Sequence, residues 1–455
     1  MNKMQGKSAL VIGGSLAGLL AARILSDHFD RVTIIERDLM HNLPESRKGQ
    51  PQTSHLHGLL VQGLKILTGY FPDLIEGLLS GGNPLLDMGQ SMRWYCYGGY
   101  RARFEFGMKG ILTSRPFLEW HIRQRVVTLP NVTVRDGYAV EKLLATDNHK
   151  QITGVQLKTT GLDTQPETLL ADLVIDTSGR GSRSSKWLEE LGYSKPAETA
   201  VTCGAGYACR IYRRNSAEPG SQDWVFITPQ APREQRMGAA FPIEDDKWMV
   251  GLAGWHGDHA PANEKGFKAF AKSLPASDVY DIIANSTPLS DIVIYKFAAS
   301  LRRHYEKLEH FPQRYLVLGD AVCSFNPLYG QGMTSAAMQA AALDALLREQ
   351  ASLDGMAKTY FKQIAKIVDI PWQTAVGEDF RFPETKGKKA PGTDLINAYI
   401  DRVHRATHKD VVVGAAFLKV MNMIEPPTSL LSPQILWRVL QNTVQKRPVR
   451  ETVPA

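Results

Sequence analysis

The chain has 455 residues, of which 43% are hydrophobic and 22% are charged, and its formal net charge is +7. This length suffices for two or three domains, and the composition is that of an ordinary globular protein. The Lys and Arg residues form no dense block interleaved with aromatic residues, which argues against a nucleic-acid partner.

The four cysteines and the N-terminal segment indicate the cellular compartment in which we expect the protein. Cys96, Cys203, Cys209 and Cys323 show no C-x-x-C spacing, which argues against a zinc site and a disulfide framework and fits a reducing compartment. Residues 1–7 are polar and run directly into an apolar segment, which leaves no room for a signal peptide. No apolar run reaches the roughly 18 residues of a membrane span. We therefore expect a cytoplasmic protein.

Residues 9–18 read A-L-V-I-G-G-S-L-A-G, an apolar run followed by a glycine-rich turn. The run predicts a strand buried in a parallel sheet, and residues 16–25 predict an apolar helix. Gly13 permits a tight turn, Gly18 lets helix and strand approach closely, and the helix start can bind a pyrophosphate. This is the G-x-G-x-x-G pattern with Ser15 as its middle residue, and it predicts a dinucleotide site.

A second apolar strand, residues 32–36, ends in Glu36. A carboxylate about 20 residues after such a turn can accept hydrogen bonds from ribose hydroxyls. The polar segment that follows contains Arg47 and Lys48. A cationic loop there suits a pyrophosphate that must also be neutralised from outside the helix start, and a solvated charged loop is the alternative.

Further strand-turn-helix patterns follow along the chain. Aromatic residues alternate with polar ones over 94–106, and again over 199–255, as in strands. The other predicted elements are helices over 58–79, 115–127 (with Ser114 as its cap) and 333–347, and strands over 132–134, 139–145, 152–158, 169–175, 292–297 and 315–318. The strands over 199–255 are predicted to form an antiparallel sheet, whose aromatic residues provide either the floor of a pocket or simply part of the hydrophobic core.

Residues 354–455 predict helices, with Pro371, Pro383, Pro391, Pro426, Pro427 and Pro433 as breaks. The amphipathic stretch 411–424 and the apolar stretch 430–440 precede the basic residues Lys446, Arg447 and Arg450. This pattern is compatible with a peripheral membrane contact, and packing against the body of the protein is the favoured alternative.

Three motifs resemble the FAD-binding signatures of single-component flavoprotein monooxygenases, the aromatic hydroxylase and squalene epoxidase superfamily. They are Gly13 to Gly18 with Glu36, the turn Asp176 to Ser182, and Gly319-Asp320 to Gly332, and they span about residues 8–348. The resemblance implies an α/β fold. Its parts are a discontinuous Rossmann-type FAD-binding domain (1–75, 108–192 and 290–350), an inserted antiparallel substrate sheet (76–107 and 193–289) and a C-terminal helical region (351–455).

The resemblance also implies which residues contact FAD. The glycine turn would hold the pyrophosphate, Glu36 the adenosine ribose, and Asp320 the ribitol, while the segment after Asn326 would approach the pyrimidine edge of the flavin. The full set is Gly13, Gly14, Ser15, Gly18, Glu36, Arg37, Arg47 or Lys48, Arg115, Asp320, Pro327, Gly330, Gln331, Gly332 and Met333.

The sequence departs from the better-known members at three points. Ser178 replaces the aspartate of the hydroxylase Asp-Gly motif, and Cys323 replaces a histidine. The D-x-S-G form also looks like flavin-dependent halogenases, but the halogenase W-x-W-x-I-P signature is missing. Residues 47–60 are similar to flavoproteins of polyketide and terpenoid tailoring, which include cyclases that keep FAD as a scaffold.

These observations favour an FAD-dependent monooxygenase that hydroxylates or epoxidises a hydrophobic small molecule, with NADPH or NADH as a transient reductant and O₂. The alternative is a non-redox, FAD-scaffolded cyclase or isomerase of secondary metabolism, followed by a halogenase or a prenyl reductase. The flavin supplies the chemistry, so His57 is only a weak catalytic candidate, with a structural role as its alternative. His55 and His57 alternate as metal ligands can, but no Cys or acidic cluster completes a shell, and we expect no metal.

Overall fold

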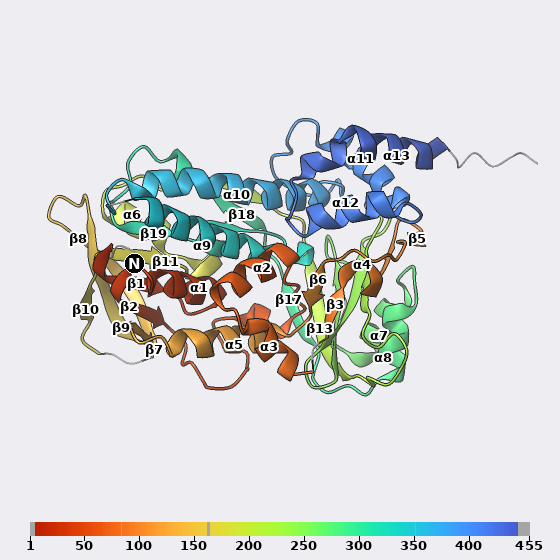
Figure 1. The fold of residues 1–455 in the computed structure, drawn as a ribbon, viewed down its shortest axis with the longest axis horizontal. Coiled ribbons are helices and arrows are strands. Elements are labelled where there is room, and N and C mark those ends of the chain that lie inside the picture. Colours follow the sequence, from red (N-terminus) through yellow and green to blue (C-terminus); the bar gives the residue numbers. More distant parts are fainter. Residues whose placement is uncertain (1–4, 83, 162–163, 351, 445–455) are drawn as a thin grey trace, which may run out of the picture.

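The protein is described by a computed structural model covering residues 5–82, 84–161, 164–350 and 352–444 (Figure 1). Its N-terminal part is built on a five-stranded sheet in the order β19-β11-β1-β2-β7, and all neighbouring strands pair in parallel. The strands are β1 (Gly6–Ile12), β2 (Phe29–Glu36), β7 (Val132–Asp136), β11 (Leu173–Asp176) and β19 (Tyr315–Val317). The predicted parallel sheet is confirmed, and β19 joins it from beyond the aromatic strands.

Helices and a second sheet cover this parallel sheet. Helix α9 packs against α1, α2 and α10, while the antiparallel strands β8, β9 and β10 contact the sheet through β2 and β11 (Figure 1). The bounds are α1 (Leu16–Leu25), α2 (Val61–Tyr70), α3 (Leu74–Ser80), α5 (Arg115–Val127), α6 (Ser184–Glu190), α9 (Gly332–Glu349), α10 (Met356–Asp379), β8 (Tyr138–Ala145), β9 (Ile152–Thr159) and β10 (Glu167–Leu170).

Two predicted elements are divided in the structure. The stretch 169–175 contributes to both β10 and β11, because the chain crosses there from the antiparallel to the parallel sheet; Asp172 Oδ2 accepts hydrogen bonds from the backbone N–H groups of Lys7 and Ser8 at this crossing. The helix predicted over 58–79 is interrupted between α2 and α3. Pro72 disfavours the helical conformation of the residue before it, so the first helix ends there.

The aromatic strands form a seven-stranded sheet in the order β17-β13-β16-β15-β14-β4-β5. Its strands are β4 (Met92–Cys96), β5 (Gly99–Tyr100), β13 (Gly206–Arg213), β14 (Trp224–Ile227), β15 (Arg236–Ile243), β16 (Lys247–Gly254) and β17 (Val293–Lys296). The sheet is antiparallel as predicted except that β4 pairs with β14 in parallel. The predicted strand over 94–106 is too long: Phe104 and Phe106 lie outside any strand.

The two faces of this sheet differ in their surroundings. On one face Tyr212 and Trp248 pack with Phe267 and Phe270 of α7 (Glu264–Lys272) and with Val279 of α8 (Asp278–Asn285). The other face carries Trp94, Tyr207 and Phe241 and packs against the nucleotide-fold part of the chain, through Leu56 and Tyr329 among others. The aromatic residues of the first face are therefore core.

Helix α10 is followed by α11 (Thr393–Ala406), α12 (Val411–Met421) and α13 (Pro433–Val444), which lie above the aromatic sheet in Figure 1. Pro371 does not break the chain as predicted: it lies inside α10 and is buried there. An interior proline costs a helix roughly 3 kcal/mol, and the packing of α10 against α9 offsets this.

The C-terminal helices pack together around Val403, Val413 and Val439, but α13 leaves Trp437 63% exposed. Lys446, Arg447 and Arg450 lie outside the described residues, so the membrane contact remains a prediction. Among the residues that the structure describes, no helix is both long enough and apolar enough to cross a membrane.

Short elements connect these parts. They are β3 (Leu85–Asp87), α4 (Met88–Ser91), β6 (Lys109–Ile111), β12 (Glu198–Val201), β18 (Ser300–Arg303) and β20 (Cys323–Ser324). Strands β12, β18 and β20 form a small sheet next to the turn that follows β19.

Candidate cofactor site

The glycine turn after β1 is as tight as its sequence predicts. Gly13 has φ +104°, and a Cβ on Gly18 would lie 1.8 Å from the Gly13 carbonyl oxygen. Helix α1 starts at Leu16 without a side-chain cap, because Ser15 Oγ instead donates a hydrogen bond to Glu119 Oε2 at 2.9 Å. The first N–H groups of α1 therefore meet the conditions for binding an anion.

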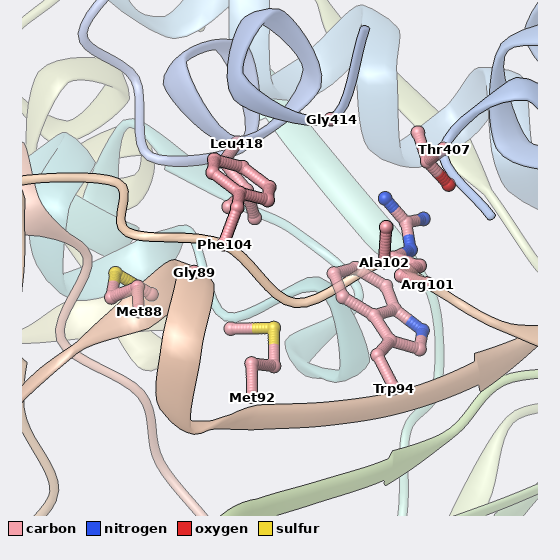
Figure 2. Close-up of a pocket in the computed structure, with 10 residues that line it drawn as sticks. All are labelled: Met88, Gly89, Met92, Trp94, Arg101, Ala102, Phe104, Thr407, Gly414 and Leu418. Carbon is pink, nitrogen blue, oxygen red and sulfur yellow. The ribbon is translucent and has the colours of Figure 1, made fainter. Parts of the chain in front are cut away.

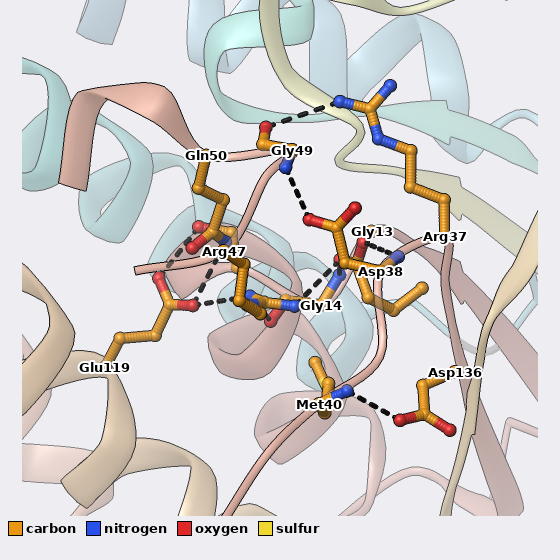
Figure 3. Close-up of polar contacts among 12 residues, drawn as sticks. Gly13, Gly14, Arg37, Asp38, Met40, Arg47, Gly49, Gln50, Glu119 and Asp136 are labelled. Atoms are coloured by element: carbon orange, nitrogen blue, oxygen red, sulfur yellow. Dashed lines mark hydrogen bonds and ion pairs between the residues drawn. The ribbon is translucent and has the colours of Figure 1, made fainter. Parts of the chain in front are cut away.

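Glu36 lies directly beside this turn, which Figure 3 shows at Gly13 and Gly14 together with Arg47 and Glu119. Its Oε2 accepts a hydrogen bond from the Gly14 backbone N–H at 2.7 Å, and its Oε1 accepts one from the Asp38 backbone N–H at 3.0 Å. The side chain of Arg37 points away from the turn: it is exposed and donates to the Gly49 carbonyl oxygen. Of these two neighbouring residues, Glu36 is the one at the turn.

Arg47 and Lys48 occupy different environments. Arg47 is buried, and its Nη2 donates to Glu119 Oε1 at 2.7 Å and to the Gly14 carbonyl oxygen at 3.2 Å. Its Nη1 lies 3.5 Å from Glu36 Oε2 but has no hydrogen-bond partner although it is buried. Lys48 is exposed. The structure thus places Arg47, and not Lys48, at the turn.

Glu119 on α5 is a central residue of this cluster that the sequence reasoning missed. It is 3% exposed and accepts hydrogen bonds from Ser15, Arg47, Gln50 and Arg115. Burial alone would raise its pKa, but the positive charges of Arg115 and Arg47 together with these hydrogen bonds hold the pKa below its ordinary value. The four-residue spacing of Arg115 and Glu119 on one helix was the available signal.

Asp320 follows β19 and faces the start of α9. A Cβ on Gly332 would lie 3.9 Å from Asp320 Oδ1, and Gly319 before it has φ +74°. The Asp320 side chain is exposed, yet its deep position raises its pKa, opposed by the positive charges of Arg115 and Arg180. A carboxylate that is deep in the molecule and still accessible is suited to accept hydrogen bonds from a ligand.

The segment before α9 forms the 3₁₀ turn Pro327–Tyr329, with Pro327 itself exposed. Gly330 has φ +68°, and a Cβ on it would lie 4.0 Å from the Gly58 carbonyl oxygen, so this segment borders residues 55–60. Gln331 and Met333 are buried, and Gln331 Oε1 has no hydrogen-bond partner.

Asp379, the last residue of α10, anchors this segment and was also missed. It is fully buried, and its Oδ1 accepts hydrogen bonds from Tyr329 OH (2.8 Å), Asn326 Nδ2 (2.9 Å) and Trp255 Nε1 (3.2 Å). Burial raises its pKa, although these donors oppose the shift. Nothing in the sequence around residue 379 indicates this contact, because it joins three distant segments.

His57 is neutral in this environment. Burial, together with the nearby charge of Arg115, lowers its pKa to about 3, and its Nδ1–H donates to the His55 carbonyl oxygen at 2.9 Å. Its Nε2 can accept a hydrogen bond, but it would not hold a proton near neutral pH. His55 packs edge-on against Tyr207 at 4.7 Å. No group of three or more metal-ligating side chains occurs among the residues that the structure describes.

The turn Asp176 to Ser182, the second of the three motifs, is held by hydrogen bonds to the Asp176 side chain. Asp176 is fully buried and accepts hydrogen bonds from Ser178, Ser182 and Ser184. Ser178, which stands where the hydroxylases have aspartate, donates its Oγ–H to Asp176 Oδ1 at 2.6 Å. Its hydroxyl therefore stabilises the turn. Cys323 is buried, and burial raises the pKa of its thiol well above the ordinary value.

The fold is that of FAD-dependent monooxygenases and flavin-dependent halogenases. Similar solved structures are PqsL, a probable FAD-dependent monooxygenase from Pseudomonas aeruginosa (TM-score 0.62, 16% identity, 83% of this chain and 98% of that one) and the flavin-dependent brominase Bmp2 (0.65, 13%, 97% and 100%). A third is the flavin-dependent halogenase CmlS (0.65, 17%, 92% and 77%). The resemblance found in the sequence is thereby confirmed for the fold.

A closer relative exists at the level of sequence. The chain is 31% identical over 450 residues to Protein Rv3254 of Mycobacterium tuberculosis, covering 96% of this chain and 94% of that protein. It therefore belongs to the same family as Protein Rv3254. No family model matches the chain.

Proposed function

We propose that the protein is an FAD-dependent monooxygenase that hydroxylates or epoxidises a hydrophobic small molecule with NAD(P)H and O₂. The observation that carries the proposal is the cluster at the end of β1. It combines an uncapped helix start, a glycine turn that admits no side chain, and the buried Arg47 with an unpartnered N–H group. These features fit a pyrophosphate.

The other residues extend this fit along an FAD molecule. Glu36 would accept hydrogen bonds from the adenosine ribose, and Asp320 from the ribitol. The start of α9 at Gly332 would present backbone N–H groups to the pyrimidine edge, where a reduced flavin is negative. When bound, FAD supplies the electron transfer to oxygen that side chains cannot perform.

The aromatic sheet would provide the substrate side of the site. Tyr207, Trp255 and Phe297 cluster with Leu328 and Tyr329, which lie in the segment assigned to the flavin. Such a surface excludes water and suits a large lipophilic polyketide, terpenoid or polycyclic aromatic compound. We expect such compounds to perturb the flavin spectrum and simple benzoates, which are small charged acids with a single ring, to leave it unchanged.

The test of the function begins with the purified protein. It should be yellow, and denaturation should release FAD, because no segment resembles a covalent attachment site. Under air, a lipophilic substrate should stimulate NADPH consumption, and without oxygen NADPH should bleach the flavin. A colourless protein that takes up no FAD on reconstitution would remove the proposal.

The same experiment separates the alternatives. A yellow protein whose flavin is never reduced by NADPH or NADH, with or without lipophilic compounds, would favour the non-redox cyclase or isomerase. Halide-dependent product formation would instead favour a halogenase, the activity named for CmlS and Bmp2.

Two carboxylates test the placement of FAD. Glu36→Ala and Asp320→Ala should each weaken FAD binding by about 1.5–3 kcal/mol, because each removes a charged acceptor of cofactor hydroxyls. Fluorescence titration of the apoprotein with FAD measures this loss. Glu167→Ala is the control, since Glu167 pairs with Arg135 at an exposed position on β10. Unchanged affinity in either test variant would show that its end of the cofactor lies elsewhere.

A further inference from the structure

Arg101 is a buried cation in the aromatic part of the molecule. It is 9% exposed, and its guanidinium carbon lies 3.8 Å from the ring centre of Trp94 on β4 and 4.0 Å from that of Phe417 on α12. It lies at the edge of a small hollow of about 20 Å³. Figure 2 shows the other lining side chains, which are mainly apolar and include Met92, Phe104 and Leu418. A hollow of this size admits only one small group.

No carboxylate compensates this charge among the described residues. Arg101 Nη2 donates to His404 Nδ1 at 2.7 Å, whereas its Nε and Nη1 are buried without a hydrogen-bond partner. The other groups facing it are the Cys96 thiol and Tyr97. His404 is neutral, because burial and the charge of Arg101 lower its pKa far below the ordinary value.

The neighbouring arginines behave differently. Arg93 and Arg103 both pair with Asp223, at 3.0 and 2.8 Å, and Arg93 pairs also with Asp278. An arginine keeps its proton in proteins, and buried charges are normally paired. Arg101 therefore has the charge and the unused N–H groups to receive an anion.

Packed apolar side chains lie between this hollow and the proposed substrate surface. Trp94 packs on Phe226 at 5.4 Å, within the apolar cluster that Leu56 also joins. Leu56 and Phe226 belong equally to the cluster that includes Leu328 and Tyr329 in the segment assigned to the flavin. Packed apolar residues thus extend from that segment to the surroundings of Arg101.

We propose that Arg101 binds the carboxylate of an otherwise lipophilic substrate, whose apolar body lies along the aromatic sheet toward the flavin. The identity of this ligand as the substrate rests on the proposed function, but its binding needs no redox step. A guanidinium can donate two parallel N–H groups to a carboxylate. The neutral amide of the same compound would leave the buried cation uncompensated.

Isothermal titration calorimetry of the purified protein tests this with matched pairs of probes: dodecanoate with dodecanamide, and 2-naphthoate with 2-naphthamide. The wild type should bind each acid roughly ten- to a hundredfold more tightly than its amide, as for a charged hydrogen bond. Equal affinities for acid and amide would overturn the proposal without any variant.

Variants then assign the preference to Arg101. Arg101→Met should lower the affinity for the acid to that for the amide and leave amide binding nearly unchanged. Arg101→Lys keeps the charge but loses the planar fork, so part of the preference should remain. Arg103→Met is the matched control, because Arg103 is half-exposed and paired, and it should keep the full preference. A folded Arg101→Met protein that still prefers the acids would refute the assignment.

Thermal melting decides how these results are interpreted. If Arg101→Met does not fold, the comparison of Arg101→Lys with wild type decides, since a purely structural cation would leave the acid-to-amide ratio unchanged in Arg101→Lys. A protein that oxidises neutral lipophilic compounds but shows no acid preference contradicts this inference alone. An acid preference without flavin reduction by NADPH contradicts the proposed monooxygenase and leaves the Arg101 site standing.

Discussion

Replacing Gly18 by Ala should prevent formation of the proposed FAD site and strongly destabilise the protein. The added Cβ would lie 1.8 Å from the Gly13 carbonyl oxygen and 2.7 Å from Thr177 Oγ1. Thr177 is itself fixed, because its hydroxyl donates to the carbonyl oxygens of Ile12 and Gly13. Relief of the clash must therefore separate α1 from β1 or from β11, and we expect a cost of about 3 kcal/mol or more.

The measurements are the melting temperature and FAD content of the purified variant. Gly69→Ala is the matched control: Gly69 lies on the exposed side of α2, and a Cβ there would have no atom within 4 Å. This change should stabilise the helix by up to about 1 kcal/mol. A Gly18→Ala protein with wild-type melting temperature and bound FAD would contradict the turn described above.

The accurate part of the sequence prediction was the part that depends on local pattern. The strand, turn and helix around Gly13 follow from apolar runs and from glycines whose backbone conformation or close contacts exclude a side chain. The helix beginning at Arg115 was predicted with its correct bounds because its start has a local signal: Ser114 Oγ accepts a hydrogen bond from Phe117 N–H. Such features need only neighbours within a few residues.

The missed residues depend on contacts between distant segments. Glu119 receives hydrogen bonds from the β1 turn, from the loop at Arg47 and Gln50, and from its own helix. Asp379 joins the end of α10 to Tyr329 and Trp255. No periodicity or spacing in one sequence reports such pairings, and only the folded structure shows which buried carboxylates share donors.

The aromatic residues show the same limit in another form. Alternation correctly predicted strands, but it did not indicate that Tyr212 and Trp248 pack beneath α7 and α8 while Tyr207 faces the nucleotide fold. The sequence also gave no sign that Arg101, among several charged neighbours, is the one without a carboxylate partner in the described structure. The uncompensated charge of Arg101 can be recognised only from its burial and its hydrogen-bond partners in the structure.

Glu119 is the group whose removal should test the proposed cofactor site most severely. It balances two buried arginines, Arg47 and Arg115, at 2.7 and 3.4 Å. Removing one partner of a buried ion pair typically costs about 3–5 kcal/mol, because the remaining charge is uncompensated. We expect Glu119→Ala to lower the melting temperature of the apoprotein accordingly. Added FAD should restore part of this loss, since its pyrophosphate would supply negative charge to Arg47.

The contribution of Glu119 to the stability of the folded protein should depend on pH. The pKa of Glu119 in the folded protein lies below its ordinary value because Arg115 and Arg47, with their hydrogen bonds, outweigh burial. Its contribution is therefore complete above the unfolded pKa of roughly 4.3 and is lost as the pH falls through the folded pKa. The difference in melting temperature between wild type and Glu119→Gln should be largest near neutral pH and shrink on acidification below about pH 4.

The control for Glu119→Ala is Glu190→Ala, which removes an exposed partner of Lys186 and should change stability by less than about 1 kcal/mol. If Glu119→Ala were as mild as this control, the buried cluster at the β1 turn would not hold the charges described here.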